Sequence, residues 1–367
     1  MLKNGHCTPH RGKEMCSMED DLNTVARAAF ESRMIGMKAR GAGISGKIDG
    51  SSEKKAWNAL PEWIRGSRMV QGLKSAYLGS KGENEYIRIC MMSFMNYALN
   101  KRIALPKNAD KEYSDAVRRV LESFVEGASG GPLAWKRLYD KELDSKVKWK
   151  AGAYEFEGKR LPRKMFLPEV YLRHHGLKQL PQEVVARIRK GSILDVGAAI
   201  GDSTAVLSDY TDKRVYSFEC NESFRALLSE TIRLNGLKNV VPMEDAIGRS
   251  DGKLWFDGFP RDFYFHHEQK RAISMDTRSI DSVCSEKGIE GVSLIKMDIE
   301  GFELEALQGA EKTIARDRPV IIASVYHTGK DFFEIPLFLE KIHPDYRFRL
   351  LFLNDNPPTK EINLVAY

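Results

Sequence analysis

The stretch 192–204, Ser-Ile-Leu-Asp-Val-Gly-Ala-Ala-Ile-Gly-Asp-Ser-Thr, constrains the fold of this chain more than any other part of the sequence. Its apolar start, interrupted only by Asp195, predicts a short buried strand. Gly197 and Gly201 then open a turn, and the Asp-Ser-Thr that ends the stretch can cap a helix. Strand, glycine-rich turn and helix N-terminus in this order are typical of a nucleotide-type pocket at the carboxyl edge of a parallel sheet.

The spacing of the two glycines narrows the kind of ligand. The pattern is Asp-x-Gly-x-x-x-Gly, whereas a dinucleotide site typically shows Gly-x-Gly-x-x-Gly facing a pyrophosphate. A carboxylate just before the first glycine suits a ligand with a cationic amino-acid end. On this stretch alone, an ordinary strand–turn–helix of another α/β protein stays the alternative interpretation.

Strands and helices alternate through the rest of the second half. The apolar segments of strand-like length are 193–196, 214–218, 240–243, 292–297, 319–325, 347–353 and 362–367. Helical patterns separate most of them, and the helix predicted at 331–341 is interrupted by Pro336. Such alternation predicts a mostly parallel sheet with helices on its faces, which the last two strands complete as an antiparallel pair.

The first half of the chain is predicted to be organised differently, as a mainly α-helical region. Its clearest helix spans 110–126, where apolar residues recur at helical spacing, Asp110 can cap the start and Gly127 can end it. Weak alternation in 146–161 predicts a small hairpin. The predicted division is a disordered tail at 1–17, a helical domain at 18–145, a hairpin with a connecting helix at 146–190, and an α/β domain at 191–367.

Charge is distributed unevenly between the two halves. Residues 1–190 carry 36 Lys and Arg against 22 Asp and Glu, a net charge of +14, whereas residues 191–367 carry −8. A basic first half suggests an anionic partner, such as nucleic acid, a phosphorylated glycan or a lipid surface. In the alternative interpretation these charges solvate helix faces and dock on the acidic half.

Composition indicates a cytoplasmic protein. Its longest apolar runs are shorter than the roughly 18–20 residues of a membrane span, so no transmembrane segment is predicted. The polar N-terminus lacks the apolar core of a signal peptide. The five cysteines are scattered and form no Cys-x-x-Cys pair, which is typical of reduced thiols.

Polar residues follow the predicted strands at their carboxyl ends. Glu219 ends the second strand about twenty residues beyond the glycines, where a carboxylate can accept hydrogen bonds from ribose hydroxyls. Asp245 and Ala246 follow the third strand and can meet an adenine ring, although Asp245 can equally cap a loop. The fourth and fifth strands are followed by the acidic run that begins at Asp298 and by His327.

Residues 166–367 resemble the FkbM-family methyltransferases. The matching pieces are 195–204, Phe218-Glu219, Ser279-Ile-Asp281, Lys296-Met-Asp-Ile-Glu-Gly301 with Glu303 and Leu307-Gln-Gly-Ala310, and Val325-Tyr-His327. The sequence departs from the usual pattern at Ala199, where many methyltransferases have a third glycine, and at Cys220, where proline is usual.

The resemblance implies a Rossmann-like class I methyltransferase fold with S-adenosylmethionine as the methyl donor. It also implies O-methylation of a sugar, glycan or related hydroxylated metabolite. The residues expected to bind the donor are Asp195, Gly197, Ala199, Gly201, Asp202, Ser203, Glu219, Asp245, Ala246 and Asp298.

Chemistry on a hydroxyl acceptor requires more than the activated donor. The enzyme has to align the hydroxyl with the methyl group, and a base or a metal has to assist loss of its proton. The predicted catalytic residues are His327, Asp298 and Glu300, with His327 or Asp298 as the base. Asp298 and Glu300 could instead hold a divalent cation, but no metal is predicted.

Two other functions stay open at this point. One is methylation of nucleic acid, with the basic first half as the binding surface. Against it, the chain lacks the Asn/Asp-Pro-Pro-aromatic motif of amino-methylation, since Asn356-Pro-Pro is followed by threonine. The other is a module that binds S-adenosylmethionine without catalysis.

Overall fold

A computed structural model gives the structure of the chain. It describes residues 23, 93, 94, 97, 98 and 101 and the ranges 103–128, 141–256, 273–353 and 361–367. The tail predicted at 1–17 lies outside the described residues, and so does most of the region between residues 18 and 102.

Seven strands form the main sheet: β4 (Ser192–Val196), β5 (Val215–Phe218), β6 (Val240–Met243), β10 (Val292–Met297), β11 (Val320–Ser324), β12 (Phe348–Phe352) and β13 (Ile362–Ala366). Their order across the sheet is β12-β13-β11-β10-β4-β5-β6. Neighbours are parallel except at β13, which is antiparallel to both β11 and β12. The predicted mostly parallel sheet with an antiparallel last strand is therefore confirmed.

The order of the strands reverses at β4. The chain builds outward from β4 through β5 and β6, and then returns to place β10 and β11 on the other side. In register, Lys296 of β10 lies beside Asp195 of β4, and Met297 lies beside Val196. Parallel sheets bind ligands outside the carboxyl ends of their strands at such a reversal. The ends of β4 and β10 are therefore where a site is expected.

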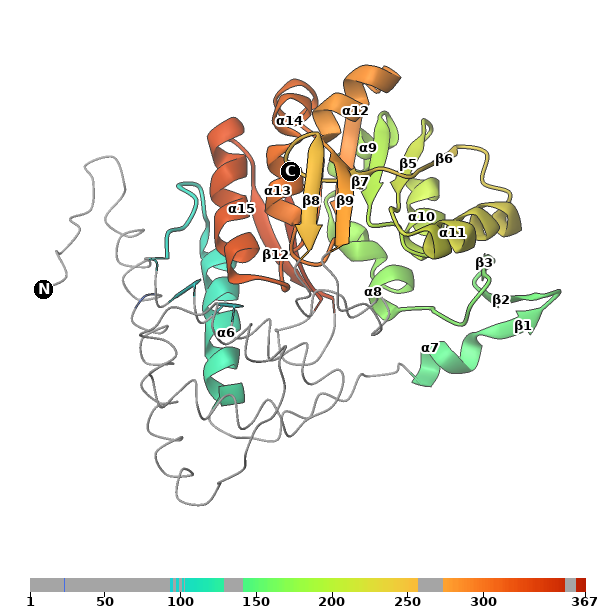
Figure 1. The fold of residues 1–367 in the computed structure, drawn as a ribbon. Coiled ribbons are helices and arrows are strands. Elements are labelled where there is room, and N and C mark those ends of the chain that lie inside the picture. Colours follow the sequence, from blue (N-terminus) through green and yellow to red (C-terminus); the bar gives the residue numbers. More distant parts are fainter. Residues whose placement is uncertain are drawn as a thin grey trace, which may run out of the picture.

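Helices cover both faces of the sheet (Figure 1). One face carries α9 (Gln182–Arg189), α10 (Asp202–Leu207) and α11 (Glu222–Asn235). The other carries α12 (Ile280–Lys287), α13 (Glu303–Gln308), α14 (Glu311–Asp317) and α15 (Gly329–Ile342). The strands are apolar toward both sides, since Ile193 joins the core on the first face and Leu194 the core on the second. None of the described helices combines the length with the apolar character that crossing a bilayer requires.

α6 (Lys111–Ala128) packs into the core of the second face, close to β12. Asp110 caps it as predicted, because its carboxylate accepts a hydrogen bond from the backbone N–H of Tyr113 at 2.8 Å. The rings of Tyr113 and Phe348 lie 6.2 Å apart. Gly127 does not end the helix, which continues to Ala128, since a single glycine weakens a helix without stopping it.

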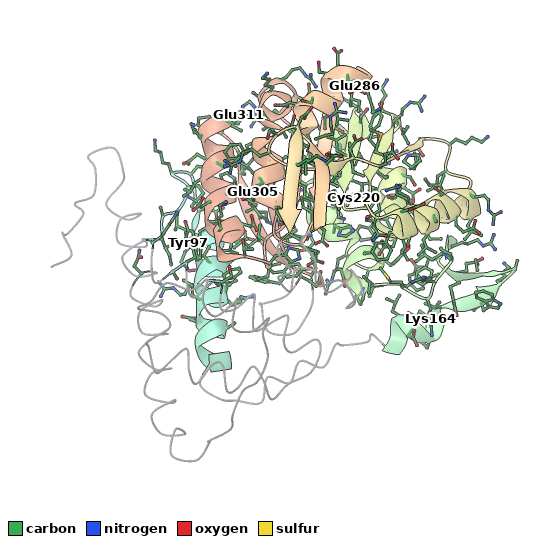
Figure 2. The ribbon with its side chains drawn as sticks, viewed as in Figure 1. Tyr97, Lys164, Cys220, Glu286, Glu305 and Glu311 are labelled. Atoms are coloured by element: carbon green, nitrogen blue, oxygen red, sulfur yellow. The ribbon has the colours of Figure 1, made fainter. Side chains whose placement is uncertain are left out.

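Residues before α6 pack on α15. The rings of Tyr97 and Phe333 stack with centroids 5.1 Å apart, and Tyr97 is labelled beside α15 in Figure 2. Phe94 contacts Phe332 at the same centroid distance, 5.1 Å. The hydroxyl of Ser93 accepts a hydrogen bond from the backbone N–H of Gly329 at 3.2 Å. Described parts of the first half therefore share the core of the sheet.

A two-stranded hairpin was predicted within 146–161, but the structure has a three-stranded antiparallel sheet there. It follows α7 (Lys141–Lys146) and consists of β1 (Lys148–Lys150), β2 (Ala153–Phe156) and β3 (Lys159–Leu161). Ala151–Gly152 and Glu157–Gly158 all have positive φ angles, as two-residue hairpin turns require. Each glycine marks one turn, and two turns give three strands. A second small sheet joins β7 (Ala246–Ile247), β8 (Gly252–Phe256) and β9 (Ile273–Arg278).

Pro336 does not interrupt α15, contrary to the prediction. The helix runs from Gly329 to Ile342 with the proline inside it. Proline removes one backbone hydrogen bond, at a cost of about 3 kcal/mol. Buried side chains on both sides of it, Phe332, Phe333 and Leu339, join the core and hold the helix together. Tertiary packing therefore overrides the local signal.

Candidate active site

Asp195, the next-to-last residue of β4, lies in a closed hydrogen-bonded network. Its carboxylate is fully buried and accepts hydrogen bonds from the hydroxyls of Ser203 at 3.0 Å and Thr204 at 2.7 Å. The ammonium of Lys296 lies 3.3 Å from the same carboxylate and donates to the backbone carbonyl of Gly197 at 3.2 Å. Asp195 and Ser203 therefore face each other, and the network ties β4, β10 and α10 together around the glycine loop.

Lys296 keeps its charge although it is buried. Burial by itself lowers the pKa of this lysine, but the neighbouring carboxylates of Asp195, Asp298 and Asp202 raise the pKa above its ordinary value. Asp202 behaves differently, because burial raises its pKa to about 7 even though Lys296 lies nearby. The network thus contains one permanent cation at its centre.

The glycine loop packs directly on the end of β10. Gly197 and Gly201 both have φ near +84°, a region that other residues rarely adopt. A β-carbon on Gly197 would lie 2.1 Å from the backbone oxygen of Asp298. The backbone N–H of Asp298 also donates to the carbonyl of Val196 at 3.0 Å. The loop and the acidic run after β10 are therefore held against each other.

Ala199 and Glu219 complete the loop on the β5 side. Ala199 has a left-handed backbone, with φ of +46°, where a third glycine is usual. The carboxylate of Glu219 accepts hydrogen bonds from the backbone N–H groups of Ala199 at 2.9 Å and Asn221 at 2.8 Å. Burial raises the pKa of Glu219 despite these bonds. The structure thus brings Glu219 to the glycine loop, and its binding of a ribose stays a prediction.

Asp245 and Ala246 follow the end of the next strand, and Asp245 lines a cavity of about 630 Å³. The cavity is lined by residues of α11, the end of β6 and α12, with Asp245 and Arg278. A carboxylate oxygen of Asp245 lies 3.8 Å from the guanidinium of Arg278. Ala246 begins β7 and pairs with Thr277. The sequence analysis did not single out Arg278, because the strand that contains it carries no recognisable motif.

His327 brings the acidic residues after β10 together. One ring nitrogen, Nε2, lies 3.5 Å from a carboxylate oxygen of Asp298 and 3.5 Å from one of Glu300. The other, Nδ1, lies 3.1 Å from Glu303. The side chains of His327 and Glu303 are 2% and 0% exposed, whereas those of Asp298 and Glu300 are 29% and 34% exposed. Asp298 and Glu300 therefore face outward, with His327 and Glu303 behind them.

Glu303 was part of the FkbM-like motif in the sequence, but it was given no role there. Its carboxylate accepts hydrogen bonds from the backbone N–H groups of Ile299 at 2.8 Å and Gly301 at 2.9 Å. The turn between them is strained, because Glu300 has a φ of +58°. The repeated acidic spacing in Asp-Ile-Glu-Gly-Phe-Glu was the available signal, but its meaning depends on where the turn points each side chain.

Electrostatics make His327 a cation in this cluster. Burial alone lowers the pKa of the imidazole, but the carboxylates of Glu303, Glu300 and Asp298 outweigh it and raise the pKa to about 10. The same contact lowers the pKa of Glu303 despite its burial. At neutral pH the imidazole therefore holds both of its protons and is not free to accept another.

The donor atoms of Asp298, Glu303 and His327 lie within 4.8 Å of one another, the one grouping within the described ranges that could hold a metal ion. Two backbone N–H groups already donate to Glu303, and the imidazolium supplies positive charge at the centre. That this site works without a metal ion stays a prediction.

Residues 195–350 match the family model of the methyltransferase FkbM domain. The hexuronic acid methyltransferase AglP of Haloferax volcanii is 29% identical over 140 residues, which cover 37% of this chain and 56% of that protein. The 2-O-methyltransferase NoeI of Sinorhizobium fredii is 41% identical over 159 residues, which cover 37% of this chain and 65% of that protein. The chain thus spans between about half and two thirds of the curated relatives it matches.

Among solved structures, methyltransferase FkbM from Methylobacillus flagellatus aligns with a TM-score of 0.46 and 20% identity. The alignment covers 77% of this chain and 58% of that one.

Proposed function

Because residues 195–350 match the FkbM methyltransferase domain, we propose that this protein is an S-adenosylmethionine-dependent O-methyltransferase. Its acceptor is a hydroxyl of a sugar, glycan or related metabolite. The observation that carries the proposal is the direct contact between the glycine loop after β4 and the carboxylate–imidazole cluster after β10 and β11. The two curated relatives named above, a hexuronic acid methyltransferase and a 2-O-methyltransferase, support a carbohydrate-type acceptor.

The residues around the glycine loop fit the donor. Gly197 and Gly201 let the loop pack closely on the end of β10 and on α11, and Glu219 stands at the end of the next strand with its carboxylate beside the loop. Asp245 and Ala246 follow at the third strand end and would meet the adenine. When bound, S-adenosylmethionine supplies a methyl group that its sulfonium has already activated.

The remaining residues that are predicted to bind S-adenosylmethionine form two groups, one that supports the glycine loop and one that borders it. Asp195 and Ser203 act on the donor through the loop they hold in shape, since their side chains bond to each other. Ala199, Asp202 and Asp298 border the loop and are proposed to contact the donor directly.

Asp298 is the proposed proton acceptor for the acceptor hydroxyl. His327 is already protonated at neutral pH and lies behind the outward-facing carboxylates. Asp298 is reachable from outside and lies against the glycine loop, where the methyl group would be presented. As the hydroxyl oxygen gains the methyl group, its proton passes to the Asp298 carboxylate. His327 holds Asp298 and Glu300 in place by its charge, so it is a positioning residue.

Asp298→Asn tests this assignment. We expect turnover to fall about 10²–10⁴-fold, the usual contribution of a positioned base, and to fall much more than donor affinity does. Glu305→Gln is the matched control, because Glu305 lies on the neighbouring α13 and pairs with Lys330 at a partly exposed position. Near-normal turnover in Asp298→Asn would remove Asp298 from this role.

The acceptor class is tested with labelled S-adenosylmethionine and a cell extract divided into glycan, nucleic-acid, protein and small-molecule fractions. We expect label in the glycan or small-molecule fraction. Label in nucleic acid would instead make the basic first half the substrate-binding region. Donor binding without label in any fraction would favour a module that does not catalyse. The names of the two relatives, a hexuronic acid methyltransferase and a 2-O-methyltransferase, do not point to a nucleic-acid acceptor.

A further inference from the structure

The segment that joins the small β-sheet to α9 lies beside the helix that follows the glycine loop. It contains α8 (Pro168–Tyr171) and the 3-10 helix η1 (His174–Gln179), and both pack against α10. His174 and His175 have φ angles of +49° and +52°, and Gly176 follows with +92°. Such a conformation costs of order 1–3 kcal/mol at each non-glycine residue and persists only where packing enforces it.

Packing enforces the turn at Gly176. A β-carbon there would lie 2.4 Å from a methyl group of Leu351 in β12. The amide of Asn363 in β13 also donates to the backbone carbonyl of His175 at 3.4 Å. The turn is thus fixed over the carboxyl edge of the sheet, and it fixes the direction of the His175 side chain.

Two polar atoms of this segment are buried without a hydrogen-bond partner among the described residues. They are the hydroxyl oxygen of Tyr171 and Nε2 of His175. The two residues are 3% and 5% exposed. A buried polar atom left without a partner costs about 1–3 kcal/mol, and native proteins rarely leave one so. Two such atoms within five residues of sequence therefore call for a shared explanation.

Both residues interact with groups of the glycine loop or with groups that bond to it. The ring of Tyr171 packs in the same cluster as Ile200, and burial together with the Asp202 carboxylate raises the pKa of its hydroxyl. Burial lowers the pKa of His175, and the ammonium of Lys296 lowers it further. His175 is therefore neutral and carries one ring N–H, while Tyr171 carries one O–H.

We propose that Tyr171 and His175 donate hydrogen bonds to the carboxylate of the amino-acid end of S-adenosylmethionine. A carboxylate only accepts hydrogen bonds, and both groups can donate. Lys296, which bonds the loop, adds a favourable charge nearby, and Asp202 stands close enough to receive the ammonium of the same end. This inference rests on the proposed donor and assigns two residues that lie before the FkbM domain match.

The test compares two ligands that share the adenosine part. S-adenosylhomocysteine carries the amino-acid end, and 5′-methylthioadenosine lacks it. Their dissociation constants are measured by calorimetry for the full chain and for Tyr171→Phe and His175→Asn. Asparagine is used because it tolerates a left-handed backbone, while its shorter amide does not reach the position of Nε2. Tyr210→Phe is the matched control, since its hydroxyl bonds to Nδ1 of His174 at 2.7 Å.

We expect each variant to bind S-adenosylhomocysteine about 10- to 100-fold more weakly, as for loss of a hydrogen bond to a charged group. Binding of 5′-methylthioadenosine stays within about twofold of the wild-type value, which also shows that the variant is folded. Tyr210→Phe binds both ligands as the wild type does.

Other outcomes overturn the proposal. Unchanged binding of S-adenosylhomocysteine in both variants would mean that the two buried atoms meet only water. Equal loss of both ligands would mean that Tyr171 and His175 support the loop without touching the amino-acid end. If the wild type binds neither ligand, the proposed donor itself is wrong, which separates that failure from the other two.

Discussion

Two buried cations, Lys296 and His327, lie at the carboxyl edge of the sheet in different surroundings. Lys296 pairs with one fully buried carboxylate, that of Asp195, and bonds one backbone carbonyl. His327 meets three carboxylates, and two of them, Asp298 and Glu300, are about one third exposed. We call Lys296 and Asp195, with their hydrogen-bond partners, the closed network, because its groups satisfy one another. We call His327 and its three carboxylates the open cluster, because it keeps carboxylate oxygens toward the outside.

From this difference we expect the first cluster to hold the glycine loop in shape and the second to take part in the chemistry. A closed network fixes the glycine loop, because loss of either charge leaves the other one buried without its partner. The open cluster has more negative charge than its imidazolium balances, so an acceptor hydroxyl can meet a carboxylate there. Changes in the first should act on stability, and changes in the second on pH dependence and turnover.

The largest expected effect is in the closed network. Lys296→Met leaves the Asp195 carboxylate buried without a cation, so the free energy of unfolding should fall by about 3–5 kcal/mol. The measurement is urea unfolding at neutral pH. Lys330→Met is the control, because its pair with Glu305 is partly exposed and is expected to contribute about 0–1 kcal/mol. Equal losses in the two variants would end the distinction between the sites.

His327 gives the open cluster a pH dependence of known sign. The unfolded imidazole has a pKa of about 6.5, and the folded pKa is raised to about 10. The stability contribution is therefore complete below about pH 6.5 and is lost as the pH rises toward 10. Between about pH 7 and 9, the wild type should lose about 1.4 kcal/mol per pH unit relative to His327→Gln. Parallel stability curves for the two proteins would show that His327 is neutral in the folded state.

Gly329 links the open cluster to the first half of the chain. A β-carbon at this position would lie 2.7 Å from the Cα of Phe94 and 2.8 Å from the Cβ of Tyr97. Gly329→Ala should therefore cost about 1–3 kcal/mol of unfolding free energy through overpacking. Turnover should fall more than donor affinity, because His327 is two residues away. Gly248→Ala, where the nearest atom is 3.4 Å away, is the near-neutral control in both assays.

The smallest expected effect is again in the closed network. Ser203→Ala removes one of the two hydroxyls that donate to Asp195, while Thr204 and Lys296 remain. The cost in unfolding free energy should be about 1 kcal/mol, typical of one hydrogen bond in a network that stays satisfied. A loss as large as that of Lys296→Met would mean that the hydroxyl, and not the ammonium, compensates the buried carboxylate.

Local patterns were sufficient for most of the sheet and for the position of the glycine loop. Apolar runs such as 193–196 and 292–297 predicted strands because a strand buried on both faces needs apolar side chains throughout. The strand ends then placed Glu219, Asp298 and His327 at one edge, since parallel strands end on the same side. Pro336 misled the same reasoning, because long-range packing supports the helix around it.

The sequence by itself determined the fold of the second half and which residues gather at the carboxyl edge. Periodicity and the order of strands are local properties that a chain carries in its own pattern. Only the tertiary structure decided what those residues meet there: that Lys296 neutralises Asp195, that Glu303 lies behind His327, and that Tyr171 shares a core cluster with Ile200 of the glycine loop. Charge, burial and hydrogen bonding depend on neighbours that are distant in sequence, so these roles emerge only when the chain is folded.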